Sequence, residues 1–221
     1  KVAEIYGSNP QEVLLYTVLG SESLDEPDTI VSSFDLALLD HLPAEEHKKI
    51  DGYEEVNEIP FDPERRRNSV LIKKGNKYEL IVRGEPGTIL KFVDNLDNKE
   101  KENIDQWIVK EGKIGHRVLA VAKREMDGKE DYDILDEEKK LVFLGLVSFT
   151  DPIKKTVKDT IRRAESLGVK IKIITGDSKE VAGAVACQVG LIDLPSEVIL
   201  GEELGKMSVE EQHRTVEKYA V

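Results

Sequence analysis

The stretch Ser69-Val70-Leu71-Ile72-Lys73-Lys74-Gly75-Asn76-Lys77-Tyr78-Glu79-Leu80-Ile81-Val82 decides the fold of the first part of the chain. Two β-rich runs, residues 69–72 and 78–82, flank the Gly75-Asn76 pair. This arrangement is typical of a β-hairpin, because Gly and Asn are favoured in the tight turns that join antiparallel strands. The sequence therefore predicts two antiparallel strands that meet at residues 75–76.

The segments around this hairpin alternate between strand-like and helix-like patterns. Apolar runs predict strands at residues 2–6, 117–122 and 141–149. Apolar residues at helical spacing predict helices at residues 11–19, at about 32–42 and around Trp107. This mixture predicts an α+β fold, an antiparallel sheet with flanking helices, over residues 1–150.

The pattern changes at Asp151. Asp151-Pro152 is typical of a helix start, with a carboxylate cap and a proline in the first turn. Residues 169–174 are a candidate buried strand, the turn Thr175-Gly176-Asp177 follows, and a second helix is expected over residues 178–189. Helix, strand, turn and helix in this order predict an α/β, Rossmann-type segment over residues 151–221.

The composition is that of a globular protein with an acidic surface. The 221 residues include 39% hydrophobic and 34% charged side chains and carry a formal net charge of −12. This charge argues against a general nucleic-acid or anionic-membrane binder, since both need a basic surface. The single cysteine excludes a disulfide framework. The longest apolar run, residues 141–149, is shorter than the ~20 residues that a membrane span needs.

Common nucleotide-binding and metal-binding motifs do not occur. The sequence contains neither G-x-x-x-x-G-K-[ST] nor G-x-G-x-x-G. The four histidines are too scattered for a recognisable metal pattern, so no metal site is predicted on protein side chains.

The first motif with chemical potential is Phe61-Asp62-Pro63-Glu64-Arg65-Arg66-Arg67. Three consecutive arginines beside a phenylalanine reverse the local charge of an acidic chain. An aromatic face can stack on a base, and guanidinium groups can pair with phosphates. A core phenylalanine beside a solvated basic edge explains the same residues, and the motif alone leaves both interpretations open.

Three further motifs are weaker when each is taken alone. Arg83-Gly84 places a cation at a strand end beside a glycine turn, and Arg117 opens an apolar strand. Both are common structural features. Thr175-Gly176-Asp177 and the helix start that follows form an anion-binding corner, although Thr175 is explained equally well as a turn or cap residue.

Together and in this order, these motifs resemble the cytoplasmic part of P-type cation-transporting ATPases over nearly the whole chain. Pro60-Phe61-Asp62-x-Glu64-Arg65-Arg66-Arg67-x-Ser69-Val70, Ser32-x-x-Asp35-x-Ala37 and Thr175-Gly176-Asp177-Ser178 are most similar to the magnesium-transporting branch. The resemblance implies a nucleotide-binding domain at residues 1–150 and a partial, haloacid-dehalogenase-like phosphorylation domain at residues 151–221.

The resemblance also implies roles for individual residues. Phe61 would stack on adenine, and Asp35 would lie near the adenine amino group. Arg66 would take the place of a phosphate-contacting cation. The full nucleotide-binding set implied in this way is Asp35, Phe61, Arg66, Arg83, Gly84, Arg117 and Leu119, in which Arg117 approaches the phosphates and Leu119 forms an apolar wall.

In the second part, Asp151 and Pro152 would form a hinge, and Thr175, Gly176 and Asp177 would contact the phosphoryl group. The sequence departs from the family pattern in two places. Arg83 replaces the usual lysine, which is not a neutral change because a guanidinium is larger and planar. Asp151-Pro152-Ile153-Lys154 lacks the second proline and the arginine of the family's hinge.

Two family motifs are not in the sequence: the phosphorylated aspartate of Asp-Lys-Thr-Gly-Thr and the Gly-Asp-Gly-x-Asn-Asp loop that holds Mg²⁺. The chain is therefore expected to be part of a longer integral membrane pump and to lie on its cytoplasmic face. It would bind ATP or ADP, with Mg²⁺ arriving as Mg-ATP, and would have no turnover alone. Its partners would be the remaining phosphorylation-domain segments, the actuator domain and the transmembrane helices, and not a nucleic acid.

Two other functions stay open on the residues alone. A stand-alone phosphatase of the haloacid-dehalogenase type needs an Asp-x-Asp nucleophile, and the one match, Asp131-Tyr132-Asp133, follows no apolar strand. A non-catalytic interaction module would use the basic edge at residues 65–67 to bind an acidic partner.

Overall fold

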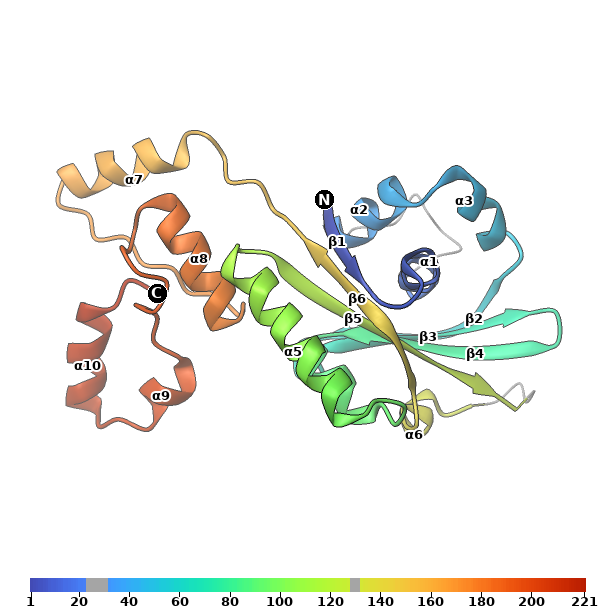
Figure 1. The fold of residues 1–221 in the computed structure, drawn as a ribbon. Coiled ribbons are helices and arrows are strands. Elements are labelled where there is room, and N and C mark those ends of the chain that lie inside the picture. Colours follow the sequence, from blue (N-terminus) through green and yellow to red (C-terminus); the bar gives the residue numbers. More distant parts are fainter. Residues whose placement is uncertain (23–31, 128–131) are drawn as a thin grey trace. The chain divides into compact units, whose positions relative to one another are not determined.

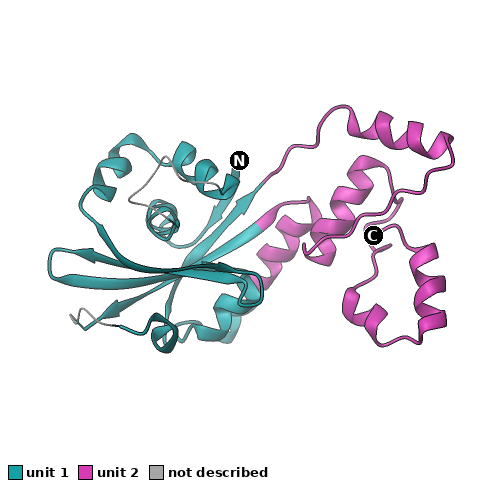
Figure 2. Ribbon diagram, turned by 180° about the vertical axis from the view of Figure 1, so that it is seen from behind, with its two compact units in different colours: residues 1–102, 118–149 teal, residues 103–117, 150–221 magenta. Residues whose placement is uncertain are grey.

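The computed structural model describes residues 1–22, 32–127 and 132–221. These residues form two compact units (Figure 2). Unit 1 contains residues 1–102 and 118–149, and unit 2 contains residues 103–117 and 150–221. The division into functional domains at residue 150 stays a prediction.

A six-stranded sheet in the order β1-β6-β5-β4-β3-β2 is the framework of unit 1 (Figure 1). The pairings β1–β6, β2–β3, β3–β4 and β4–β5 are antiparallel, which confirms the predicted sheet. The strands are β1 (Val2–Tyr6), β2 (Glu54–Asp62), β3 (Arg67–Lys74), β4 (Lys77–Gly84), β5 (Arg117–Met126) and β6 (Val142–Phe149).

The predicted hairpin is the pair β3–β4. Lys74 lies opposite Lys77, and Gly75 takes the left-handed backbone conformation that the turn requires, with φ of 60°. The register then sets Arg67 opposite Gly84 at the other end of the hairpin. Since β2 ends at Asp62 opposite Arg67, the end of β2, the start of β3 and the end of β4 meet at one edge of the sheet.

Helices α1 (Pro10–Leu19), α2 (Ser33–His41) and α3 (Ala44–Ile50) lie on one face of this sheet (Figure 1). The Asn9 side chain caps α1 by accepting the Glu12 N–H at 3.3 Å. Every residue of α1 from 13 to 19 is buried, because sheet strands and both neighbouring helices surround it. The core of unit 1 therefore lies between α1 and the inner residues of β3, β4, β5 and β6.

The remaining helices of the first part are short except for one. They are α4 (Pro86–Ile89), the 3-10 turn η2 (Leu90–Phe92), α5 (Asn98–Lys113) and α6 (Ile134–Glu137). The amphipathic helix predicted around Trp107 is α5, whose buried apolar residue is Ile104.

Residues 150–221 contain four helices and no strand. The helices are α7 (Val157–Ser166), α8 (Lys179–Val189), α9 (Gly201–Gly205) and α10 (Val209–Lys218). The helix predicted at residues 178–189 is confirmed as α8. Ser178 caps its start and Gly190, with φ of 80°, ends it in the left-handed conformation.

The prediction of a buried strand at residues 169–174 is wrong for this structure. Val169 and Ile174 are 53% and 98% exposed, and the segment is not assigned to a strand. A buried parallel strand needs neighbouring strands on both edges and covered faces. Here the Ile173 N–H donates instead to the Ala220 carbonyl, at 2.8 Å. The apolar run is present, but the neighbours that would make it a sheet strand are not in unit 2.

The helix predicted to start at Asp151 begins later, at Val157. A start at residue 152 would place Lys154 and Lys155 in the first turn, where the helix dipole disfavours positive charge. The observed start places Asp159 in the first turn, with one lysine, Lys158, beside it. None of the helices in the described ranges is long and apolar enough to cross a bilayer.

Candidate functional site

The aromatic residue of the predicted site is exposed. Phe61, the second-last residue of β2, has 55% of its surface accessible. Its backbone N–H donates to Glu22 Oε1 at 2.6 Å, which fixes the strand end. An apolar ring exposed to this extent contributes little to the core, so the alternative of a core phenylalanine is wrong.

Arg66 lies in the turn between β2 and β3, five residues after Phe61. Its backbone has φ of 55°, a left-handed conformation that is uncommon for a residue with a side chain. The Arg66 N–H donates to the Asp62 carbonyl at 2.6 Å, and the Arg66 carbonyl accepts the Glu85 N–H at 3.0 Å. The side chain is exposed. The turn therefore holds its backbone on both sides and leaves the guanidinium in solvent.

Gly84 lies beneath this turn. A Cβ atom at Gly84 would be 2.3 Å from the Arg66 carbonyl oxygen and 2.8 Å from Arg67 Cα. Both neighbours are backbone atoms, which cannot rotate away. Glycine is therefore required here by close backbone approach. Two of the predicted nucleotide-binding residues, Arg66 and Gly84, are thus neighbours in the structure.

The structure brings Asp35 and Arg83 together as an ion pair. Arg83 Nη1 lies 2.6 Å from Asp35 Oδ1, and the two residues are only 5% and 2% exposed. Arg83 also donates from Nε to Asn68 Oδ1 at 3.0 Å and from Nη1 to the Thr17 carbonyl at 2.9 Å. A nucleotide contact by either residue stays a prediction, since both side chains are engaged with each other below the surface.

Leu119 lies near the start of β5, and it is partly buried against the core of unit 1. Its neighbour Ala120 pairs with Gly84. Leu119 therefore follows the same edge of the sheet as Gly84. Its predicted role as an apolar wall stays a prediction.

Within unit 2, Arg117 is paired with the loop predicted to contact phosphate. Arg117 Nε and Nη2 lie 2.8 and 2.9 Å from the two carboxylate oxygens of Asp177, a bidentate arrangement. The Thr175 hydroxyl donates to Asp177 Oδ2 at 2.9 Å, and it accepts the Asp177 N–H at 3.1 Å. Thr175 and Asp177 also line a cavity of about 310 Å³. Gly176 between them is exposed.

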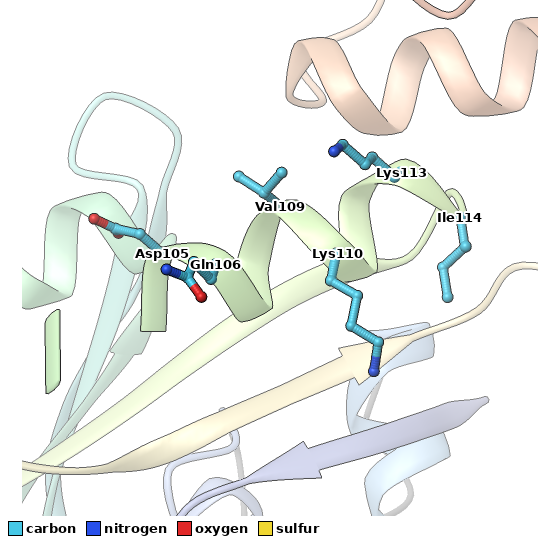
Figure 3. Close-up of a pocket in the computed structure, with 6 residues that line it drawn as sticks. All are labelled: Asp105, Gln106, Val109, Lys110, Lys113 and Ile114. Carbon is cyan, nitrogen blue, oxygen red and sulfur yellow. The ribbon is translucent and has the colours of Figure 1, made fainter. Parts of the chain in front are cut away.

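The predicted hinge residues Asp151 and Pro152 are exposed and belong to no helix or strand. Their role as a hinge stays a prediction. The larger hollow of about 580 Å³ runs along α5 in unit 2 (Figure 3). It is lined by one helix and its end, with Val109 and Ile114 beside Lys110 and Lys113, and none of the predicted site residues is among its lining residues.

The residues of the two alternative functions have structural roles in the described part of the chain. The basic edge of an interaction module is largely occupied, because Arg65 and Arg67 form ion pairs with Glu138. In the Asp-x-Asp sequence, Asp131 lies outside the described residues. Asp133 caps α6 by accepting the Leu135 N–H at 3.1 Å.

A sequence model of the family described as "P-type ATPase, cytoplasmic domain N" matches residues 25–156. The chain belongs to the P-type ATPases. The matched region contains the turn with Phe61 and Arg66, the Gly84 contact and the start of β5. The family resemblance inferred from the motifs is thereby confirmed.

Relatives of this P-type ATPase chain differ in the ion that their names give. A "Probable cation-transporting P-type ATPase" from Mycoplasma genitalium is 32% identical over 71% of the chain and 18% of its own length. A "Magnesium-transporting ATPase, P-type 1" from Salmonella typhimurium is 31% identical over 79% and 20%. A "Calcium-transporting ATPase 1" from Bacillus cereus is 29% identical over 71% and 18%. The chain spans about a fifth of the length of these relatives.

Sequence reasoning missed two residues that contact the predicted site residues or their neighbours in this P-type ATPase chain. Asn68 joins Arg83 to the Gly20 carbonyl, to which it donates at 2.8 Å. The hairpin could have revealed it, since a turn at residues 75–76 places Asn68 opposite Arg83. Glu138 is buried and forms ion pairs with Arg65 and Arg67, which belong with Arg66 to the segment that we call the arginine turn. No local pattern in the sequence connects Glu138 to that turn.

Proposed function

We propose that this chain is the nucleotide-binding part of a P-type cation pump, and that residues 1–150 bind ATP or ADP. The observation that carries the proposal is that Phe61, at the end of β2, and Arg66, in the turn that follows, both have exposed side chains. Stacking on a purine is sequence-tolerant and needs a free aromatic face, whereas the phosphates need a cation within reach. Gly84 supports the proposal, because the absence of a side chain there lets the end of β4 approach the backbone of Arg66 closely.

The rest of the proposal rests on the family. In the intact pump, ATP would transfer its γ-phosphoryl group to an aspartate, and cation transport would follow. Residues 151–221 would be a partial phosphorylation domain of the haloacid-dehalogenase-like type, with Thr175, Gly176 and Asp177 next to the phosphoryl group. Mg²⁺ would arrive as Mg-ATP. The sequence motifs and the Salmonella typhimurium relative favour the magnesium-transporting branch.

The roles of this chain's own residues follow from the geometry. Phe61 would orient the base, and Arg66 would offset phosphate charge as ATP binds. Such positioning and electrostatics account for most of the catalysis of phosphoryl transfer. Arg117 is paired with Asp177 in unit 2. On nucleotide binding it would release the Asp177 carboxylate and bind a phosphate of ATP in its place. One stacked ring and a few exposed cation contacts predict a Kd in roughly the 10 μM to mM range.

The Phe61→Ala variant tests this function. We expect its Kd for ATP to rise about tenfold, because base stacking on an aromatic side chain contributes about 1–3 kcal/mol. The measurement is an ATP titration followed by amide NMR shifts. Leu135→Ala is the matched control, since Leu135 has the same 55% exposure and lies in α6. No saturable shift in the wild-type chain up to several millimolar ATP, or equal affinity in Phe61→Ala, would falsify the proposal.

A further inference from the structure

Glu138 is a buried carboxylate on which the arginine turn rests. It follows α6 and has a side chain that is 1% exposed. Its Oε2 lies 2.7 Å from Arg67 Nε and 2.6 Å from Arg67 Nη2. Its Oε1 accepts from the Ser69 hydroxyl at 2.5 Å and pairs with Arg65 Nη2. One carboxylate therefore binds both arginines that flank Arg66, and both lie in unit 1 with it.

The three consecutive arginines are consequently not equivalent. The side chains of Arg65 and Arg67 are 20% and 15% exposed and point to Glu138. The Arg67 guanidinium also lies over the Phe92 ring, 4.6 Å from its centroid. The Arg66 side chain is exposed and has no hydrogen bond or ion pair with any described residue. Of this basic edge, one guanidinium alone is free to meet a ligand.

The cluster of Glu138 with Arg65 and Arg67 lowers the stability of the folded state in one respect. Arg65 Nε and Nη1 are buried without a hydrogen-bond partner among the described residues, and buried unsatisfied donors are rare in native proteins. A buried charge cluster is also weak evidence for stabilisation, because desolvation offsets the ionic attraction. The cluster instead fixes geometry: it pins the residues on both sides of Arg66, whose backbone has the uncommon φ of 55°.

We propose that Glu138 is a positioning residue for nucleotide phosphates: it anchors Arg65 and Arg67 so that, of the three consecutive arginines, Arg66 alone faces the phosphate chain. The proposal rests on the proposed ATP-binding function of Phe61 and Arg66. The two halves of the ligand then depend on different structural elements. The purine depends on Phe61 at the end of β2, and the phosphates depend on Arg66 through Glu138.

Glu138 affects the affinity for ATP in two opposite ways: its negative charge weakens the binding of an anion, whereas its anchoring of the turn strengthens it. Removing a negative charge near the turn would by itself strengthen the binding of an anion. At 0.15 M salt the screening length is about 8 Å, so this long-range gain is small for an exposed site. Loss of the anchor would free two partly buried side chains and the backbone between them. At this ionic strength we therefore expect positioning to outweigh charge.

The test compares Glu138→Gln with the wild-type chain in titrations with ATP and with adenosine, followed by amide NMR shifts at 0.15 M salt. We expect ATP to bind roughly tenfold more weakly, while adenosine shifts the same resonances with an affinity within about twofold of wild type. Glu137→Gln is the matched control, since Glu137 is the preceding residue and pairs with Arg124 at 2.8 Å instead of with the turn.

Arg67→Met breaks the same anchor from the turn side and replaces Glu138→Gln if that variant does not fold. Unchanged or tighter ATP binding in the variant would overturn the proposal. Equal weakening of ATP and adenosine would also overturn it, because Glu138 would then be only structural. Failure of the wild-type chain to bind ATP would instead refute the proposed function itself.

Discussion

Asp35→Ala is expected to lower the free energy of unfolding by about 3–5 kcal/mol, the cost of removing one partner from a buried ion pair. Asp35 is 2% exposed and lies 2.6 Å from Arg83, which is itself 5% exposed. Without the carboxylate, Arg83 keeps the Thr17 carbonyl and Asn68 as hydrogen-bond partners but has no compensating charge. Urea unfolding followed by far-UV circular dichroism measures the change.

The control for this substitution is Asp40→Ala on the same helix. Asp40 is exposed, so its loss should change the unfolding free energy by no more than about 0.5 kcal/mol. The double variant Asp35→Leu/Arg83→Met should recover much of the stability, because well-packed apolar residues often replace a buried pair without loss. A loss below about 1 kcal/mol for Asp35→Ala would show that the pair is solvated in solution, as the predicted nucleotide contacts of Asp35 and Arg83 would require.

The parts of the fold that could be predicted from the sequence depend on local patterns. The Gly75-Asn76 turn determined the hairpin, and the hairpin determined the register that places Arg67 opposite Gly84. Ser178 and Gly190 marked the ends of α8 because caps act within one turn. Phe61 and Arg66 were found because they belong to one short sequence motif, at the end of β2 and in the turn that follows it.

The features that could not be predicted from the sequence depend on contacts between residues that are distant in sequence. The pairing of Arg83 with Asp35 joins β4 to α2, and the anchor of Arg65 and Arg67 comes from Glu138 after α6. No periodicity in the sequence reports such contacts. Residues 169–174 have the composition of a strand, but a strand in a sheet also needs neighbours, and composition does not contain them.

Gly84→Ala is expected to damage both stability and ATP binding. The added Cβ would lie 2.3 Å from the Arg66 carbonyl oxygen, so the turn and the end of β4 must separate. Forcing extra atoms into a packed site costs about 1–3 kcal/mol. The same movement would break the hydrogen bond of 3.0 Å from the Glu85 N–H to the Arg66 carbonyl. We therefore expect ATP affinity to fall at least about tenfold, measured by amide NMR titration beside urea unfolding.

Gly87→Ala separates this steric effect from a general effect of losing a glycine. The three atoms nearest to a Cβ at Gly87 all belong to the Glu85 side chain, with Oε1 at 3.0 Å, so a shift of a few tenths of an ångström by that carboxylate relieves the contact without moving any backbone. Its stability and ATP affinity should stay close to those of wild type. Near-wild-type ATP binding in Gly84→Ala, with its stability reduced, would mean that Arg66 reaches the phosphates without the support of β4. The site would then depend on the Phe61 side of the turn and on Glu138, and the close approach at Gly84 would serve the sheet alone.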